Sequence, residues 1–235
     1  PPANWAALAE LGKPLAFAAA APNALFPLTL YRASGGLVID EEAHPVLEVT
    51  PLSEVLNFFS QGSRSGYFPF SLTQFETQEQ LWSAYQEGQA DMVITWASRY
   101  LQAPLEDSTL AGIPTANSIP YSTGTGWAWA LTSTDPQRQE LAAELAEFLT
   151  TAGFLAEWDA AAGYLPPRPS ALTTWEDNPQ RNLLIQVSQS AQLVPTNEIL
   201  GALSPALSSS TISVLKDQAD PDTAAQSAVD MLVVP

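Results

Sequence analysis

The chain has 235 residues, which suits one large domain or two small lobes, and its 46 % hydrophobic content with seven Trp is typical of a folded globular protein. Eight basic residues against 25 acidic ones give a formal net charge of −17, which disfavours nucleic acid and anionic membrane surfaces as partners. The chain has no Cys, which excludes disulfides, Cys-ligated zinc and thiol nucleophiles.

Hydropathy and the start of the chain bear on its location. No apolar run approaches the roughly 20 residues that a membrane-spanning helix needs. No signal peptide is visible, and the first residue is Pro1 rather than Met. We therefore expect a mature protein or a fragment of a longer one.

The first part of the chain alternates between helix and strand signals. Asn4 suits the N-cap and Gly12 the end of a first helix, and Thr50 followed by Pro51 predicts the start of a longer one. The buried face of that longer helix is predicted to comprise Leu52, Val55, Leu56 and Phe59. The predicted elements, in order, are a helix over 5–11, a buried strand over 14–20, a helix from 23 to the glycine pair at 35–36, a β-hairpin of 37–40 with 45–49, a helix from 51 and a loop over 61–66.

Capping signals and prolines divide the rest of the chain. Thr77 with Gln80 resembles a capping box, and the Asp-Pro pairs at 135–136 and 220–221 predict two further helix starts. The predicted elements, in order, are a helix from 77 to 88, a strand over 90–95, irregular chain to 121, a strand over 126–132, the longest helix from 136, a helix after 153, an extended passage over 163–172, and helices over 179–190, 204–217 and 222–232. Helices that alternate with short strands indicate an α/β class with more helix than sheet.

The most informative segment is EGQADMVITWASRY, residues 87–100. A polar helix stops at a glycine, a short apolar strand follows, and the end of this strand brings Trp96, Arg99 and Tyr100 close together. In open α/β sheets ligands bind beyond the carboxyl ends of the strands, and sugars pack on flat aromatic faces. This pattern predicts the lip of a binding cleft. The alternative is a buried strand followed by packed aromatics and a solvated Arg99.

Six segments together resemble the carbohydrate-type extracellular solute-binding proteins of ABC importers, the maltose-binding-protein-like group. They occur in the family's order and are PPANWAAL (1–8), LYRASGG (30–36), LWSAYQEGQADMVITW (81–96), TGWAWALTSTDPQRQELAAELAEFL (125–149), GYLPPRPSAL (163–172) and DPDTAAQSAV (220–229). Two positions depart from the family's pattern. Asp91 stands where the family usually has Ala, and Leu25 with Phe26 occupies the region of an aromatic expected elsewhere in that helix.

The resemblance implies a periplasmic-binding-protein-like fold of type II, helix-rich around a short mixed sheet. It also implies that the chain lacks most of the N-terminal lobe, because nothing here resembles the family's first-lobe segment that precedes PPANWAAL. Residues 1–121 and 165–235 would form the second, C-terminal lobe. Residues 122–164 would be the strand and helices that normally join the first lobe.

The resemblance also implies roles for individual residues. Trp96 or Tyr100 would stack on the ligand and Arg99 would donate hydrogen bonds to it, since a guanidinium presents five donors in a fixed fork. Trp127 would contact the ligand where the preceding glycine permits close approach. The alternative for Trp127, and for Trp129 on the same face, is packing under the helix that follows.

Other candidates carry weaker signals. Asn23 and Phe26 start a helix whose free N–H groups could face the cleft, although an ordinary N-cap and a core aromatic are the alternative. Tyr121 and Trp175 lie beside irregular chain, and Arg168 is expected to fix the proline-rich passage. Asp40, Glu41 and Glu42 beside His44 are the one grouping that suggests acid–base or metal chemistry, and a solvated turn is the expected alternative.

These observations predict a binding protein without cofactor, metal or catalytic residues. It would be a monomer that captures a sugar or oligosaccharide and presents it to the membrane subunits of an ABC importer. Its location would be extracellular or periplasmic, with a lipoprotein anchor in the full-length form. Two alternatives remain open, namely a glycoside-processing enzyme with two convergent carboxylates and a non-catalytic protein-interaction module.

Overall fold

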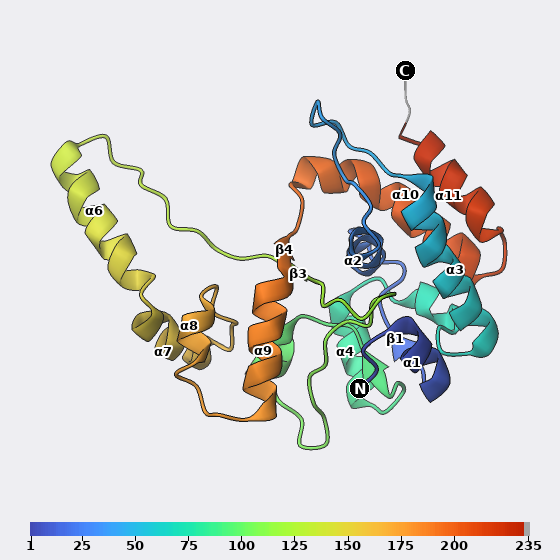
Figure 1. Cartoon of the computed structure of the whole chain (residues 1–235), viewed down its shortest axis with the longest axis horizontal. Helices are drawn as coiled ribbons and strands as arrows, with labels where there is room; N and C mark the ends of the chain where they lie inside the picture. The colour runs from blue at the N-terminus through green and yellow to red at the C-terminus, as the bar shows by residue number, and fades with distance from the viewer. Residues whose placement is uncertain (233–235) are drawn as a thin grey trace. The chain divides into compact units, whose positions relative to one another are not determined.

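The computed structural model of the chain describes residues 1–232 (Figure 1). Contacts between Cα atoms divide the chain into two units. Unit 1 comprises Pro1–Thr95, Ile113–Tyr121 and Val194–Pro235, and unit 2 comprises Trp96–Gly112 and Ser122–Leu193. The lobe boundaries expected from the sequence refer to a two-lobed relative, whereas these units are defined by contacts within this chain. The lobe assignment therefore stays a prediction.

Unit 1 consists of helices around one short strand pair. Its elements are α1 (Trp5–Leu11), β1 (Leu15–Ala16), α2 (Leu25–Ala33), α3 (Val49–Ser65), the 3-10 helix η1 (Phe70–Gln74), α4 (Gln78–Gln86), β2 (Met92–Val93), α10 (Asn197–Leu215) and α11 (Pro221–Asp230). The two strands are parallel, with Leu15 opposite Met92. The predicted strands over 14–20 and 90–95 are thus present but short, and burial extends along the first of them to Ala19.

Side-chain caps set the starts of several helices in unit 1. The Asn4 side chain accepts a hydrogen bond from the Ala7 N–H, and Thr77 forms both halves of a capping box with Gln80. Asp220 caps α11, whose first residue is Pro221. These starts are confirmed as the sequence predicted them, because a cap needs only residues within one turn of the helix.

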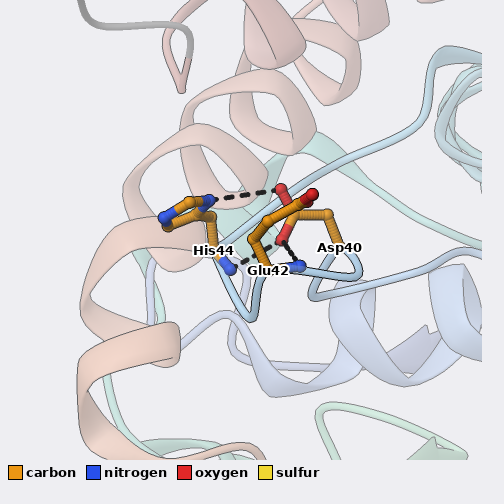
Figure 2. Close-up of side chains that lie close together, drawn as sticks. All are labelled: Asp40, Glu42 and His44. Carbon is orange, nitrogen blue, oxygen red and sulfur yellow. Dashed lines mark hydrogen bonds and ion pairs between the residues drawn. The ribbon is translucent and has the colours of Figure 1, made fainter.

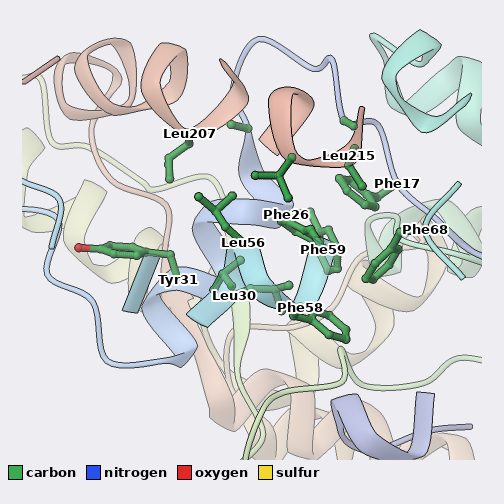
Figure 3. Packing of buried hydrophobic residues seen from close by; sticks show 14 of the residues in the cluster. Phe17, Phe26, Leu30, Tyr31, Leu56, Phe58, Phe59, Phe68, Leu207 and Leu215 are labelled. Carbon is green, nitrogen blue, oxygen red and sulfur yellow. The ribbon is translucent and has the colours of Figure 1, made fainter. Parts of the chain in front are cut away.

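The core of unit 1 is aromatic and lies between α2, α3 and α10 (Figure 3). The ring of Phe17 lies 4.7 Å from that of Phe26 and 5.2 Å from that of Phe59, between ring centroids. The predicted buried face of α3 is confirmed, since Leu52, Val55, Leu56 and Phe59 are all at most 1 % exposed. Burial of this apolar surface is the main favourable term that holds α2, α3 and α10 together.

The longest helix of the described residues, α10, is long and apolar enough by composition to cross a membrane, with a mean hydropathy of 1.2 over its window. The expectation from the sequence that no apolar run approaches this length is therefore corrected. In the structure 44 % of that window is buried, and Leu203, Leu207 and Leu215 contribute to the core of unit 1. Since α10 packs against α2, α3 and α11, core packing accounts for its composition.

Three predictions in unit 1 are corrected. Residues 61–66 are not a loop, because α3 continues to Ser65. The last long helix begins at Asn197 rather than Ser204, since α10 accommodates Pro205 in its interior. The hairpin of 37–40 with 45–49 is reduced to one antiparallel bridge, between Ile39 and Pro45.

Unit 2 is smaller and has a small core. Its elements are α5 (Ala97–Gln102), β3 (Ser122–Gly124), α6 (Pro136–Leu149), α7 (Ala152–Ala162), α8 (Pro169–Leu172), α9 (Pro179–Ser190) and β4 (Ala191–Leu193). Strands β3 and β4 are parallel neighbours. Leu155, Ala156 and Ala171 form the buried cluster, and Trp175 packs on it and donates from Nε1 to the Ala156 carbonyl at 2.9 Å. Among the described residues, the two strand pairs, β1 with β2 and β3 with β4, are thus both parallel.

Two predictions in unit 2 are wrong and one is only partly right. Residues 126–132 form no strand, because β3 ends at Gly124 and the chain is irregular from there to the start of α6. Asp135 does cap α6, but this helix of 14 residues is shorter than α3 and α10. The extended passage over 163–172 ends in the short helix α8.

Candidate functional site

The best candidate site lies on α5 in unit 2. Trp96 occupies the N-cap position of this helix with an extended backbone (φ −69°, ψ 139°), and Arg99 and Tyr100 follow in the helix. The Arg99 N–H donates to the Trp96 carbonyl at 3.0 Å, which places these residues on one turn. The side chains of Trp96, Arg99 and Tyr100 are all partly exposed. The structure therefore brings together the three residues that the sequence singled out, at a strand-to-helix junction.

Tyr100 is oriented by its hydroxyl. This group donates to the Ser108 carbonyl at 3.0 Å, and the Ser108 N–H donates in turn to the Leu105 carbonyl. Because the hydroxyl is already bonded within the chain, Tyr100 offers mainly a ring face to a ligand. Hydrogen bonding at this junction would fall to Arg99.

Trp127 lies on the irregular chain before α6 and is 92 % exposed. Trp129 is 65 % exposed, so the alternative that these two indoles pack under the following helix is wrong for both. An indole with its faces free can stack on a sugar ring or pack on another protein surface. Trp96 and Trp127 both reach solvent, as a binding role for either of them requires.

Asn23 and Phe26 lie in unit 1. Asn23 is exposed, but it is not the N-cap of α2, because that position belongs to Ala24 with φ 44° and no side-chain bond. The Asn23 carbonyl accepts from the Ser204 Oγ at 3.0 Å. Phe26 is 6 % exposed within the aromatic core, so the core alternative accounts for its position.

The weaker candidates mostly have structural roles. Trp175 is fixed by its bond to the Ala156 carbonyl, and Arg168 precedes α8 with its side chain at the surface. Tyr121 lies under the guanidinium of Arg32, 5.9 Å from the ring centroid, and burial raises the pKa of its phenol although Arg32 opposes this. No sequence pattern indicates this pair, since Arg32 is distant from Tyr121 along the chain and lies in the last turn of α2.

Asp40, Glu42 and His44 offer ligand atoms within 4.8 Å of one another (Figure 2). Asp40 Oδ1 accepts from the backbone N–H of Glu42 at 3.0 Å and of His44 at 2.8 Å, while Oδ2 lies 3.4 Å from the His44 Nδ1. These bonds, led by the one from the His44 N–H, lower the pKa of the Asp40 carboxyl. The carboxylate thus closes its own turn, which is the solvated-turn alternative, and one imidazole with exposed carboxylates makes a poor metal site.

Two shallow hollows occur on α10 in unit 1, and neither includes a candidate residue. One is lined by Pro22, Pro205, Ser208 and Ile212 among others, and the second lies between α10 and α11. Both are open and lined mainly by small residues. Neither gathers the polar side chains that fix a small ligand.

Residues 1–182 match the family described as bacterial extracellular solute-binding protein, which is more than half of the chain. The chain belongs to this solute-binding family. The resemblance drawn from the six sequence segments is therefore confirmed at the level of the family. As the family's description is of extracellular proteins, it indicates an extracellular or periplasmic location. No curated protein sequence matches the chain.

Solved structures of similar fold include three sugar-related binding proteins. The cyclic alpha-maltosyl-1,6-maltose binding protein of Arthrobacter globiformis is 18 % identical with a TM-score of 0.76, over 99 % of this chain and 64 % of that one. The maltose/maltodextrin-binding domain MalE of Bdellovibrio bacteriovorus, bound to maltotriose, is 22 % identical with a TM-score of 0.65, over 99 % and 66 %. The GacH receptor of Streptomyces glaucescens, known with acarbose, is 17 % identical with a TM-score of 0.66, over 98 % and 63 %.

These likenesses establish the fold of this member of the solute-binding family. It is the α/β, periplasmic-binding-protein-like fold that the sequence predicted. The chain spans less than two thirds of the length of each of the three structures.

Proposed function

We propose that this chain is the larger part of a solute-binding protein that captures a sugar or oligosaccharide and delivers it to an ABC importer. Membership of the solute-binding family is the observation that carries this proposal. The sugar class is supported by the solved proteins of similar fold, whose ligands include maltotriose and acarbose. It is further supported by the exposed indoles of Trp127 and Trp129, because large apolar side chains gathered at a surface mark interaction sites.

In this proposal Trp96 and Trp127 supply flat apolar faces for sugar rings, and Arg99 supplies directed donors for hydroxyl groups. Tyr100 adds a ring face beside Arg99. Asn23 and Phe26, which belong to unit 1, stay predicted contacts from the sequence, and nothing in the proposal depends on either of them. Ligand affinity would be coupled to closure of two lobes by hinge bending, as in binding proteins generally.

The domain assignment belongs to the same proposal. Residues 1–121 and 165–235 would be the second lobe, and residues 122–164 would join a first lobe that this chain does not include. The exposed apolar side chains of residues 122–164 support this assignment. The most exposed of them, each at least 49 % exposed, are Trp127, Trp129, Leu131, Leu141, Leu145, Phe148 and Trp158.

The remaining parts of the proposal follow from the family. The protein would act as a monomer without enzymatic activity, cofactor or metal, since the family and the similar structures are binding proteins. A lipoprotein anchor in the full-length form would hold it near the importer.

Titration calorimetry of the full-length protein against mono- and oligosaccharides tests the proposal. We expect saturable binding of at least one sugar, weakened about tenfold or more by Trp96→Ala or Trp127→Ala, because each removes a stacking face. Phe70→Ala is the control, since Phe70 is an exposed aromatic side chain of unit 1 outside both the proposed site and the surface of residues 122–164. Binding of peptides or metal ions alone would overturn the sugar assignment. Equal losses in all three variants would overturn the proposed site.

A further inference from the structure

Helix α5 is too short to be stable by itself. It has six residues, and isolated helices below about 12 residues are marginal in water. The chain that follows it to residue 121 contains no helix, and its one strand-like pairing is an isolated bridge between Thr115 and Asn4. The orientation of Trp96 and Arg99 therefore depends on what holds α5 from outside.

One such contact joins α5 to the end of α7. Gln102, the last residue of α5, donates from Nε2 to the Ala162 carbonyl at 3.2 Å. Ala162 is the last residue of α7, and the last carbonyls of a helix have no partner within it. The bond thus satisfies the end of one helix and fixes the end of the other.

Gly163 makes this approach possible. It ends α7 in the left-handed conformation (φ 70°), and a Cβ there would lie 2.4 Å from the Gln102 Cγ and 3.1 Å from both its N and Cα. The Gln102 side chain could rotate away from such a methyl group. Its backbone could not, because the backbone of Gln102 is part of α5. Any side chain at position 163 would therefore push the Gln102 backbone, at the end of α5, away by a few tenths of an ångström.

We propose that Gln102 and Gly163 are positioning residues that hold α5, and with it Trp96 and Arg99, in the orientation that binds ligand. This inference rests on the proposed function for the ligand itself. The docking of α5 on the end of α7 can be measured without ligand. A second contact, from the Tyr100 hydroxyl to the Ser108 carbonyl, also holds α5 and is not touched by changes at Gln102 or Gly163.

The decisive variant is Gly163→Ala, with two matched controls. Gly12→Ala introduces the same left-handed strain (φ 64°) where nothing lies within 4 Å of the new methyl group. Gly153→Ala adds a methyl group to α7 itself, also into open space. Gln102→Ala removes the hydrogen bond without adding atoms.

Two measurements on each variant separate docking from binding. Amide hydrogen exchange of residues 99–102 in the ligand-free chain should be about tenfold faster in Gly163→Ala, and faster to a smaller extent in Gln102→Ala, than in either control. Sugar affinity of the full-length protein should fall in the same order, by about tenfold for Gly163→Ala.

Unchanged exchange at α5 in Gly163→Ala would overturn the inference whatever the ligand. Faster exchange with unchanged affinity would overturn the positioning role and leave the proposed function intact. If the wild-type protein binds no sugar, the proposed function is lost, and the exchange data still decide whether Gln102 and Gly163 hold α5.

Discussion

Gly62 lies in the interior of α3 against the ring of Phe68. A Cβ at Gly62 would lie 2.2 Å from the Phe68 Cδ2 and 2.7 Å from the Tyr67 Cε2, and the Gly62 carbonyl accepts from the Phe68 N–H at 3.0 Å. The chain therefore turns back after α3 and packs two buried rings directly on the helix backbone. Only a residue without a side chain permits this approach.

Gly62→Ala should destabilise unit 1 although alanine favours helix formation. Overpacking a dense core costs about 1–3 kcal/mol, which exceeds the roughly 0.5–1 kcal/mol gained by replacing a helical glycine. Urea unfolding followed by far-UV circular dichroism measures the difference. Gly201→Ala in α10 is the control, because nothing lies within 4 Å of its new methyl group and it should stabilise slightly. Equal effects of the two variants would contradict the close packing.

The same residue explains a wrong prediction from the sequence. The segment around Gly62 is rich in Gly and Ser, which locally favours a loop, but burial of Phe58, Phe59 and Phe68 keeps the helix intact to Ser65. Tertiary packing likewise retains Pro205 inside α10. Helix starts at Asn4 and Thr77 were predictable because their capping partners lie within one turn.

The local structure of the candidate site was likewise predictable, whereas its long-range contacts were not. The junction that carries Trp96, Arg99 and Tyr100 is a local pattern of strand end and helix start, and the sequence located it. The contact that fixes this junction was not predictable, since Gln102 and Ala162 are 60 residues apart. The alternation of Trp127 and Trp129 predicted a strand, but residues 126–132 form none and both indoles are exposed.

Tyr31→Phe should destabilise unit 1 by about 1–3 kcal/mol, because it removes two partly buried hydrogen bonds worth about 0.5–1.5 kcal/mol each. The buried Tyr31 hydroxyl donates to the Leu37 carbonyl at 2.5 Å and accepts from the Glu48 N–H at 2.9 Å, so phenylalanine would leave both without this partner. Tyr85→Phe is the control, since no hydrogen bond of the Tyr85 hydroxyl is found among residues 1–232. Thermal or urea unfolding measures both, and similar values for the two variants would contradict the prediction.

The Tyr31 phenol also predicts an alkaline loss of stability. Burial raises its pKa from 10.0 to about 12, so the folded state keeps the proton more tightly than the unfolded state. A group of this kind contributes stability that is fully present below pH 10 and is lost as the pH rises towards 12. The unfolding free energy should fall more between pH 9 and pH 11 for the wild type than for Tyr31→Phe.

Asp159 should make unit 2 less stable at neutral pH than at acid pH. Its side chain on α7 is 3 % exposed, its Oδ2 has no hydrogen-bond partner among the described residues, and burial raises the pKa of the carboxyl above 3.8. Because ionisation is harder in the folded state, its contribution to stability is full below pH 3.8 and falls as the pH rises through the raised pKa.

Asp159→Asn removes that ionisation. We expect the variant to be more stable than the wild type at pH 7, by about 1 kcal/mol, and the difference to shrink towards pH 4. Hydrogen exchange of α7 amides reports on unit 2 separately from unit 1. Glu157→Gln, which neutralises an exposed carboxylate of the same helix, should show no such trend. A constant difference across the pH range would contradict the assignment to Asp159.

The apolar face of α6 should contribute little stability to this chain alone. None of the 14 residues of α6 is buried, and Leu141 and Leu145 are 66 % and 56 % exposed, one helical turn apart. Leu141→Gln with Leu145→Gln should therefore change the unfolding free energy by no more than about 0.5 kcal/mol, as surface substitutions usually do. Glutamine is a good helix former, so helix propensity is largely conserved.

The same double substitution should behave differently if the proposed first lobe covers this face. In the full-length protein it should then cost about 2 kcal/mol or more, because two leucines would be lost from a packed interface. Glu140→Gln with Glu144→Gln is the control on adjacent exposed positions and should have little effect in either form. A small effect in both forms would mean that the first lobe does not cover α6. A large loss in the chain alone would mean that the face is already packed within unit 2, and either result would contradict the assignment of residues 122–164.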